Sequence, residues 1–184
     1  MTGTATIGGR AAATEVSGKT GDELLVFALS GRSFALPRAA VQSLLPMAAL
    51  AEPPNRPPLL AGFLMLPDLA LPVVSLARLL GLPELPPSPA TALVRLRGPS
   101  PRALLVDRAL AILRPDARSW RQVDPAESFG GVLRAEVMLE NETCGVLVPE
   151  RLLLREEETR IEAFRAAEEA RRRALDDRFP EEAP

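Results

Sequence analysis

Short apolar runs alternate with turn signals over most of the chain, and this pattern is typical of short β-strands rather than long helices. The first two runs flank Ser30-Gly31 and therefore predict a β-hairpin. The gaps between later runs are too short for the helical crossovers that parallel strands need, so the pattern favours small antiparallel barrels. Strands are predicted at 24–29, 33–36, 41–45, 62–66, 69–74, 91–97, 103–106, 132–139 and 143–148.

Short motifs predict where the helical and extended connections lie. Ser75 has the side chain of a helix N-cap, and Gly81 with Pro83 ends the short helix predicted over 76–80. The closely spaced prolines at 83–89 then predict a stiff connector.

The C-terminal segment, 155–184, is much richer in charged residues than the rest of the chain. Acid–arginine pairs such as Glu168/Arg172 are spaced i,i+4, which stabilises an exposed helix. Pro149 suits the first turn of this closing helix. Its thin apolar stripe leaves two interpretations open: the helix lies on the second barrel, or it docks onto a partner.

These signals divide the chain into three parts. We predict a flexible leader at 1–21, a two-lobed domain at 22–154 and a charged helix or tail at 155–184. The barrel lobes are predicted at about 22–82 and 91–154, with exchange of strands between them allowed.

The two lobes also resemble each other in sequence. Residues 25–31 can be laid on 93–98, and residues 73–80 on 146–153, at offsets of 68 and 73. These offsets are too long for a solenoid repeat and fit two copies of one small barrel.

Composition removes several classes of function. The 22 basic and 24 acidic residues leave a net charge of −2, and only 4% of residues are aromatic, so no nucleic-acid surface is expected. The absence of His excludes Ser-His-Asp triads and imidazole metal ligands. The single Cys144 makes neither an internal disulfide nor a zinc site, and we interpret it as a small buried side chain. We predict no catalysis, no cofactor, no metal and a cytoplasmic location.

Two features keep other interpretations open. The acids that could serve catalysis form no recognisable pair, but they leave a carboxylate-dependent enzyme or ligand-binding domain as a lesser alternative. Leu64, Met65 and Leu66 are consecutive apolar residues, whereas a half-buried strand would alternate. Some of them must face a second apolar surface, either the sister barrel or a partner helix in a groove. Pro67 and Asp68 interrupt the apolar stretch around them, so we predict no membrane insertion.

Several motifs follow one another in a fixed order along the two lobes. They are Leu25-Val26-Phe27-Ala28-Leu29, Ala40-Val41-Gln42-Ser43-Leu44, Pro57-Pro58 with Gly62, Leu71-Pro72-Val73-Val74 and Leu105-Val106-Asp107. In this order and spacing they resemble a CheW-like domain, the chemotaxis coupling protein family, from about residue 23 to residue 154.

The resemblance implies a fold and a function. The implied fold is mainly β, with two five-stranded SH3-like barrels side by side, short helices and a C-terminal α-helix. The implied function is a non-catalytic adaptor that couples methyl-accepting chemoreceptors to the histidine kinase CheA. Its implied partners are the helical hairpin at the receptor's cytoplasmic tip and the kinase's regulatory domain, with recruitment to membrane receptor arrays.

The resemblance also implies which residues contact partners, and it shows one departure. The implied partner-binding residues are Val41, Gln42, Leu44, Gly62, Leu64, Leu66, Leu105, Val106 and Asp107. Where the family usually has Asn-Leu-Arg-Gly, this chain has Met65-Leu66-Pro67-Asp68. Loss of the Arg and the turn Gly keeps open an alternative, a CheW-like regulatory scaffold uncoupled from the kinase.

Overall fold

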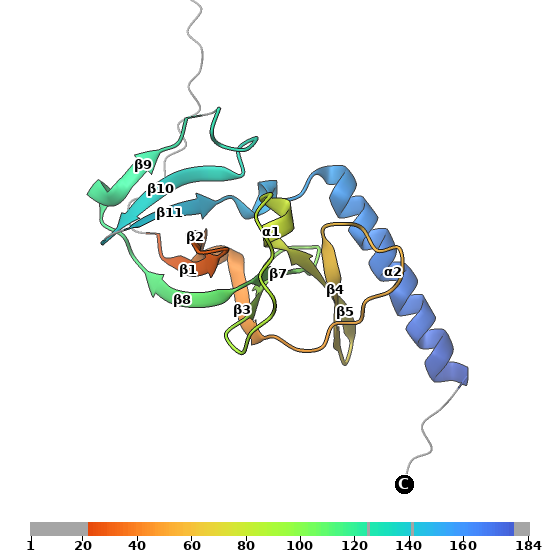
Figure 1. The fold of residues 1–184 in the computed structure, drawn as a ribbon. Helices are drawn as coiled ribbons and strands as arrows, with labels where there is room; N and C mark the ends of the chain where they lie inside the picture. The colour runs from red at the N-terminus through yellow and green to blue at the C-terminus, as the bar shows by residue number, and fades with distance from the viewer. Residues whose placement is uncertain (1–21, 125, 141, 179–184) are drawn as a thin grey trace, which may run out of the picture.

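The computed structural model describes residues 22–124, 126–140 and 142–178, and it is mainly β (Figure 1). Two β-sheets make up most of the described chain, and a long helix, α2 (Arg155–Arg178), follows them. This architecture confirms the predicted fold class of two β-lobes with a C-terminal helix. The predicted leader at 1–21 lies outside the described residues.

Sheet 1 has six strands in the order β8-β1-β2-β11-β10-β9, and sheet 2 has five in the order β3-β6-β7-β5-β4. Among the described residues, the outermost strands of each sheet do not pair with each other. The strands of sheet 1 are β1 (Leu24–Leu29), β2 (Arg32–Pro37), β8 (Arg108–Leu113), β9 (Trp120–Gln122), β10 (Leu133–Leu139) and β11 (Glu142–Leu147). Those of sheet 2 are β3 (Val41–Pro46), β4 (Leu60–Leu66), β5 (Leu69–Ser75), β6 (Ala92–Leu96) and β7 (Ala103–Val106).

Each sheet takes strands from both sides of the proline-rich connector. Strands β1 and β2 precede the connector but pair with β8 and β11, while β6 and β7 follow it and pair with β3 and β5. The chain passes between the sheets at the 3₁₀-helix η1 (Arg38–Ala40) and again at Asp107, between β7 and β8. Each half of the chain, 22–82 and 91–154, thus contributes to both sheets.

The two sheets repeat one pattern of pairing. The hairpins β4–β5 and β10–β11 share a register, and each has an irregularity directly after its first pair, Leu60↔Val74 or Leu133↔Leu147. Each hairpin is also joined through its second strand to a parallel neighbour, β7 or β2. Residues 73 positions apart in the sequence, such as Leu60 and Leu133, therefore also occupy equivalent positions in the two sheets.

The other proposed match is shifted by one residue. The register of β1 against β8 changes after Val26, and the register of β6 against β3 changes after Arg95, so these two residues are equivalent. Leu25 then corresponds to Val94 rather than to Leu93. A run of Leu and Val matches itself in more than one register, and only the bulge fixes which one is adopted.

The core has three parts. A central cluster joins the sheets and contains Phe27 of sheet 1 and Phe63 of sheet 2, both fully buried. A second cluster lies within sheet 1 and includes Cys144, and a third lies within sheet 2 and includes Leu71. Each sheet thus has its own interior, while the central cluster holds the two sheets against each other.

Two short helices follow β5 and β11. Ser75 caps α1 (Leu76–Leu79) as predicted, because its hydroxyl accepts a hydrogen bond from the Arg78 amide at 3.3 Å. The expectation that Pro149 lies in the first turn of the closing helix is wrong. Pro149 instead begins a separate 3₁₀-helix, η3 (Pro149–Arg151), and α2 begins only at Arg155. A further 3₁₀-helix, η2 (Ala117–Ser119), precedes β9.

Helix α2 packs on sheet 2, beside the hairpin β4–β5 (Figure 1). The ring of Phe164 stacks on that of Phe63, with centroids 6.2 Å apart. Glu158 pairs with Arg102, and Ile161 is buried in the central cluster. The helix therefore lies on a barrel, but on the one built around residues 41–106 rather than on residues 91–154.

This packing explains the run of consecutive apolar residues in β4. Leu64 faces the interior of sheet 2, and its neighbour Phe63 faces the opposite way, towards α2. Met65 is exposed, and the main-chain oxygen of Leu66 accepts a hydrogen bond from Arg172 of α2. The strand is covered on both faces, which removes the need for alternation.

The sequence pattern does not predict β8 or β9. Most of β8 is exposed and its sequence, Arg-Ala-Leu-Ala-Ile-Leu, does not alternate between apolar and polar residues. Strand β9 has only three residues, and two of them are exposed and polar.

Candidate partner-binding surface

The predicted site residues of β3 divide between core and surface. Val41 is only 2% exposed and belongs to the central cluster, whereas Leu44 is 44% exposed and Gln42 is also exposed. Strand geometry explains the division, because successive side chains point to opposite faces. A charge placed at Val41 would disturb folding, so only Gln42 and Leu44 offer side chains to a partner here.

The residues predicted on β4 are mostly internal. A Cβ added at Gly62 would lie 2.7 Å from the main-chain oxygen of Ala51 and 2.9 Å from Cβ of Leu50. Gly62 therefore permits a close approach of two backbones. Leu64 is buried and Leu66 half-buried in the interior of sheet 2.

The predicted triplet Leu105-Val106-Asp107 lies at the crossing from sheet 2 to sheet 1. Val106 is buried in the central cluster and Leu105 is half-buried. Oδ2 of Asp107 accepts a hydrogen bond from the Ser30 amide at 2.6 Å, which fixes the β1–β2 turn against the crossing. This carboxylate has a structural partner within the chain.

The nine predicted residues do not form one patch. Gln42 and Leu44 are the exposed members, and both lie on β3, one of the two edge strands of sheet 2. Strand β3 begins where the chain leaves sheet 1 after β2. Strand β8, one of the two edge strands of sheet 1, begins where the chain leaves sheet 2 after β7. The two edge strands therefore start at the two crossings between the sheets.

The register makes β8 the counterpart of β3. Both strands have an extra residue at their irregularity, Gln42 in β3 and Leu110 in β8, and Leu44 corresponds to Ile112. Leu110 is 40% exposed and Ile112 is 53% exposed. We call Gln42, Leu44, Leu110 and Ile112 the edge-strand surface.

Sequence reasoning missed the β8 half of this surface. The signal available was the spacing of Leu110 and Ile112, two residues apart, which places both side chains on one face of an extended strand. Large apolar side chains exposed on two unpaired sheet edges are uncommon without a partner, because free edges expose backbone donors and acceptors as well.

The described residues contain no group of three or more His, Cys, Asp or Glu side chains placed to hold a metal ion. Burial, followed by the nearby charge of Glu142, raises the pKa of the Cys144 thiol to about 12. The thiolate needed for nucleophilic attack is therefore strongly disfavoured. No helix of the described chain is long and apolar enough to cross a membrane.

One polar cluster, formed by the exposed side chains of Arg78 and Glu84 around the buried Ser75, has a structural explanation. Glu84 accepts hydrogen bonds from the Ser75 hydroxyl at 2.5 Å and from Arg78 Nε at 2.7 Å. Burial acts to raise the pKa of Glu84, but the Ser75 and Arg78 hydrogen bonds outweigh it and lower the pKa. The carboxylate ties α1 to the following connector, and it has no acid partner for catalysis.

The β4–β5 turn carries the departure noted in the sequence. Pro67 and Asp68 form this turn, and Arg172 of α2 donates hydrogen bonds to the main-chain oxygens of Leu66 and Pro67, both at 3.1 Å. A guanidinium from the C-terminal helix therefore lies at a turn that has no Arg of its own.

Comparison with known proteins identifies the family to which the chain belongs and a solved structure with a similar fold. The family model described as "CheW-like domain" matches residues 23–157. The crystal structure of the scaffolding protein TtCheW from Thermoanaerobacter tengcongensis is similar, with a TM-score of 0.66 and 15% sequence identity over 73% of this chain and 88% of that chain. No curated protein matches the chain by sequence.

Proposed function

Since the chain belongs to the CheW-like domain family, we propose that it is an adaptor that couples a chemoreceptor to the histidine kinase CheA. The family consists of non-catalytic scaffolds and adaptors, and this chain is not an enzyme. In the proposed role it binds the helical hairpin at the receptor's cytoplasmic tip and the kinase's regulatory domain. It acts in the cytoplasm, at membrane receptor arrays.

The edge-strand surface carries this proposal. Leu44 and Ile112 occupy equivalent places on one edge strand of each sheet, and in the proposed role the helical hairpin contacts both strands. Their apolar side chains would lose water on docking, which supplies the main driving force for association. The buried members of the predicted set, such as Val41 and Val106, hold these edges in place from within.

The receptor half of the proposal is tested with two surface variants. Leu44→Asp and Ile112→Asp each place a charge on an exposed position and should leave the melting temperature close to that of the wild type. Each should weaken binding of a purified receptor hairpin at least tenfold in titration calorimetry. Leu175→Asp, at a 51% exposed position on α2, is the matched control and should bind normally.

Two results would refute this assignment. The first is full receptor affinity in both edge-strand variants, and the second is an equal loss of affinity in the Leu175→Asp control. Either result would place the receptor site elsewhere on the chain.

A specific observation also favours the second candidate function, a regulatory scaffold that binds receptors but not the kinase. The β4–β5 turn lacks the Arg and Gly usual in the family, and its carbonyls are held by Arg172. Binding of the kinase regulatory domain is therefore measured for the wild type, for Arg172→Ala and for the double variant Pro67→Arg/Asp68→Gly. Kinase binding that appears only in the double variant supports the uncoupled scaffold, whereas binding by the wild type supports the adaptor.

A further inference from the structure

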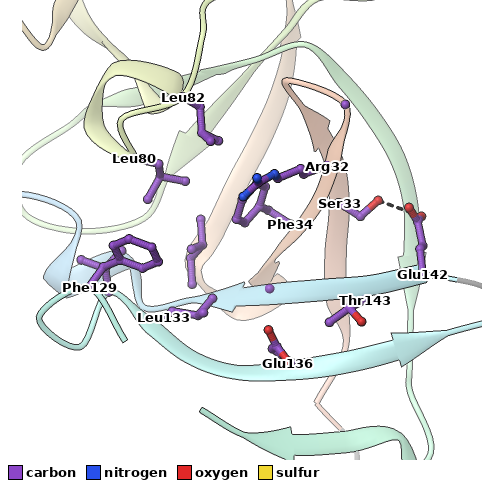
Figure 2. Close-up of a pocket in the computed structure, with 14 residues that line it drawn as sticks. Arg32, Ser33, Phe34, Leu80, Leu82, Phe129, Leu133, Glu136, Glu142 and Thr143 are labelled. Atoms are coloured by element: carbon purple, nitrogen blue, oxygen red, sulfur yellow. Dashed lines mark hydrogen bonds between the residues drawn. The ribbon is translucent and has the colours of Figure 1, made fainter. Parts of the chain in front are cut away.

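A cavity of about 420 Å³ opens on sheet 1, between the strands β2, β10 and β11 and the chain that follows α1 (Figure 2). Its lining is largely apolar and includes Phe34, Leu133 and Leu147. Figure 2 shows Leu80 and Leu82 on one side of the cavity and Leu133 and Glu136 on the other. This cavity is separate from the edge-strand surface, since no residue of that surface lines it.

The repeat within the fold identifies the counterpart of this cavity on sheet 2. The shared register makes Leu133 equivalent to Leu60, and Glu136 equivalent to Phe63. The parallel pairs Val146↔Ala35 and Val73↔Ala103 make Phe34, the residue before Ala35, equivalent to Arg102, the residue before Ala103. The cavity on sheet 1 and the α2-covered face of sheet 2 are therefore the same place on two copies of one module.

On sheet 2 this place is filled by a helix. Phe164 of α2 stacks on Phe63, and Glu158 of α2 pairs with Arg102. Ile161, three residues before Phe164, is 5% exposed. The face therefore accepts an amphipathic helix with apolar residues at i and i+3 and a charge matched to the sheet.

The local sequence explains why the same face is open on sheet 1. After β11 the chain continues through Leu152 and Leu153 into α2, whereas after β5 it continues through α1 to Leu80, the equivalent of Leu153. Gly81, with φ at +65°, and Pro83 then end the helix. No segment of the described chain takes the position on sheet 1 that α2 takes on sheet 2.

We propose that this cavity docks an amphipathic helix of a partner protein, which occupies on sheet 1 the place that α2 occupies on sheet 2. The helix presents apolar side chains to Phe34 and Leu133. A basic side chain of the helix faces Glu136, because this acid stands where sheet 2 has Phe63. The partner is another protein, since Phe164 and Glu158 already hold α2 in place on sheet 2.

The rim of the cavity supports the same occupant. Phe129 lines the cavity and is 71% exposed, so its ring offers a further apolar surface to a bound helix. Glu142 accepts a hydrogen bond from the Ser33 hydroxyl at 2.8 Å. The cavity lining thus contains two acids, Glu136 and Glu142, and one base, Arg32. The lining therefore carries a net negative charge that complements a basic helix.

The test uses α2 itself as the template for a probe. A synthetic peptide of residues 154–173 is made with Glu158→Leu and Phe164→Arg, which exchange the α2 contacts for those expected at Phe34 and Glu136. The unmodified peptide is the matched control. We expect the exchanged peptide to bind the full chain saturably and at least tenfold more tightly than the control, measured by fluorescence anisotropy.

Charge reversal in the protein then locates the binding site. Glu136→Arg should weaken binding of the exchanged peptide at least tenfold, and a peptide with Glu instead of Arg at position 164 should regain it. The protein variant Leu175→Asp should bind the exchanged peptide normally. Receptor binding by Glu136→Arg should equal that of the wild type. If the exchanged peptide fails to bind at the cavity, the proposed adaptor function is therefore unaffected.

Three outcomes would overturn the proposal. One is the absence of saturable binding by the exchanged peptide, or equal binding to the wild type and Glu136→Arg. Another is self-association of the wild type that Glu136→Arg abolishes, which would assign the cavity to a second copy of this chain. The third is an apolar dye bound in the cavity that the peptide does not displace, which would indicate a small-molecule site.

Discussion

The substitution Gly62→Ala tests whether Gly62 serves packing rather than partner contact. The added Cβ would lie 2.7 Å from the main-chain oxygen of Ala51 and 2.9 Å from Cβ of Leu50. Both distances are well inside ordinary van der Waals contact, and the nearer atom belongs to a backbone that cannot rotate away. Residues 51 and 63 also exchange two main-chain hydrogen bonds of 2.9 Å, so the backbone cannot retreat without breaking them.

The expected cost follows from this geometry. Overpacking of one methyl group against a fixed backbone destabilises a core by about 1–3 kcal/mol. For a chain of this length, that corresponds to a fall in melting temperature of about 2–12 °C. Urea denaturation should show a lower midpoint with an unchanged m-value, because the folded and unfolded surfaces stay the same.

Gly145→Ala is the matched control. Its Cβ would meet Cδ1 of Leu133 at 2.8 Å and Cδ1 of Phe34 at 3.2 Å, but these are ends of side chains beside an open cavity. They can turn aside, so Gly145→Ala should cost less than Gly62→Ala. A Gly62→Ala protein as stable as the wild type, or less damaged than Gly145→Ala, would show that the reasoning from the Ala51 contact is wrong.

Three further outcomes are expected. Phe164→Ala should cost about 1–2 kcal/mol in urea denaturation, below the range for a fully buried Phe, and should speed amide exchange in α2. Cys144 should react with a thiol reagent at pH 8 only in denaturant. Folding raises the pKa of the Cys144 thiol from 9.0 to about 12. The thiol's contribution to stability is therefore complete below pH 9 and is lost as pH rises towards 12. Cys144→Ala should flatten this part of a curve of stability against pH. Asp107→Ala leaves the Ser30 amide without its acceptor and should cost about 1–3 kcal/mol in the same urea assay.

Local signals in the sequence were sufficient for most strands and for the start of α1, but not for the start of α2, which lies at Arg155 rather than at Pro149. Ser30-Gly31 turns the first hairpin, and Ser75 caps α1, because turn and cap chemistry depends only on neighbouring residues. The offset of 73 survives in the structure because the same bulge occurs in both hairpins.

Pairing between distant strands could not be derived in this way. Nothing near β1 in the sequence indicates that it pairs with β8, more than 70 residues later, because either sheet could accept a strand of the same apolar pattern. Strand β8 was missed for a related reason: it is a mostly exposed edge strand, and its apolar residues follow no alternation. The docking of α2 on Phe63 likewise depends on a surface that exists only after both sheets form.

The candidate site was only partly accessible from the sequence. The resemblance selected segments correctly as units of the fold, but it did not separate inward from outward positions within them. Val41 and Leu44 lie in the same segment, and strand geometry buries one and exposes the other. The cavity beside Phe34 and Glu136 was not predicted at all, since its lining residues are far apart in the sequence and meet only in the folded chain.

In the proposed adaptor role this chain holds two other proteins at once and transforms neither. This is tested by sedimentation velocity on the wild-type chain mixed with a receptor hairpin and a kinase regulatory domain. We expect a single species with the summed mass of all three proteins, which disappears when the chain is omitted. Two separate binary complexes with no ternary species, or a receptor and kinase domain that sediment together without this chain, would contradict the claim.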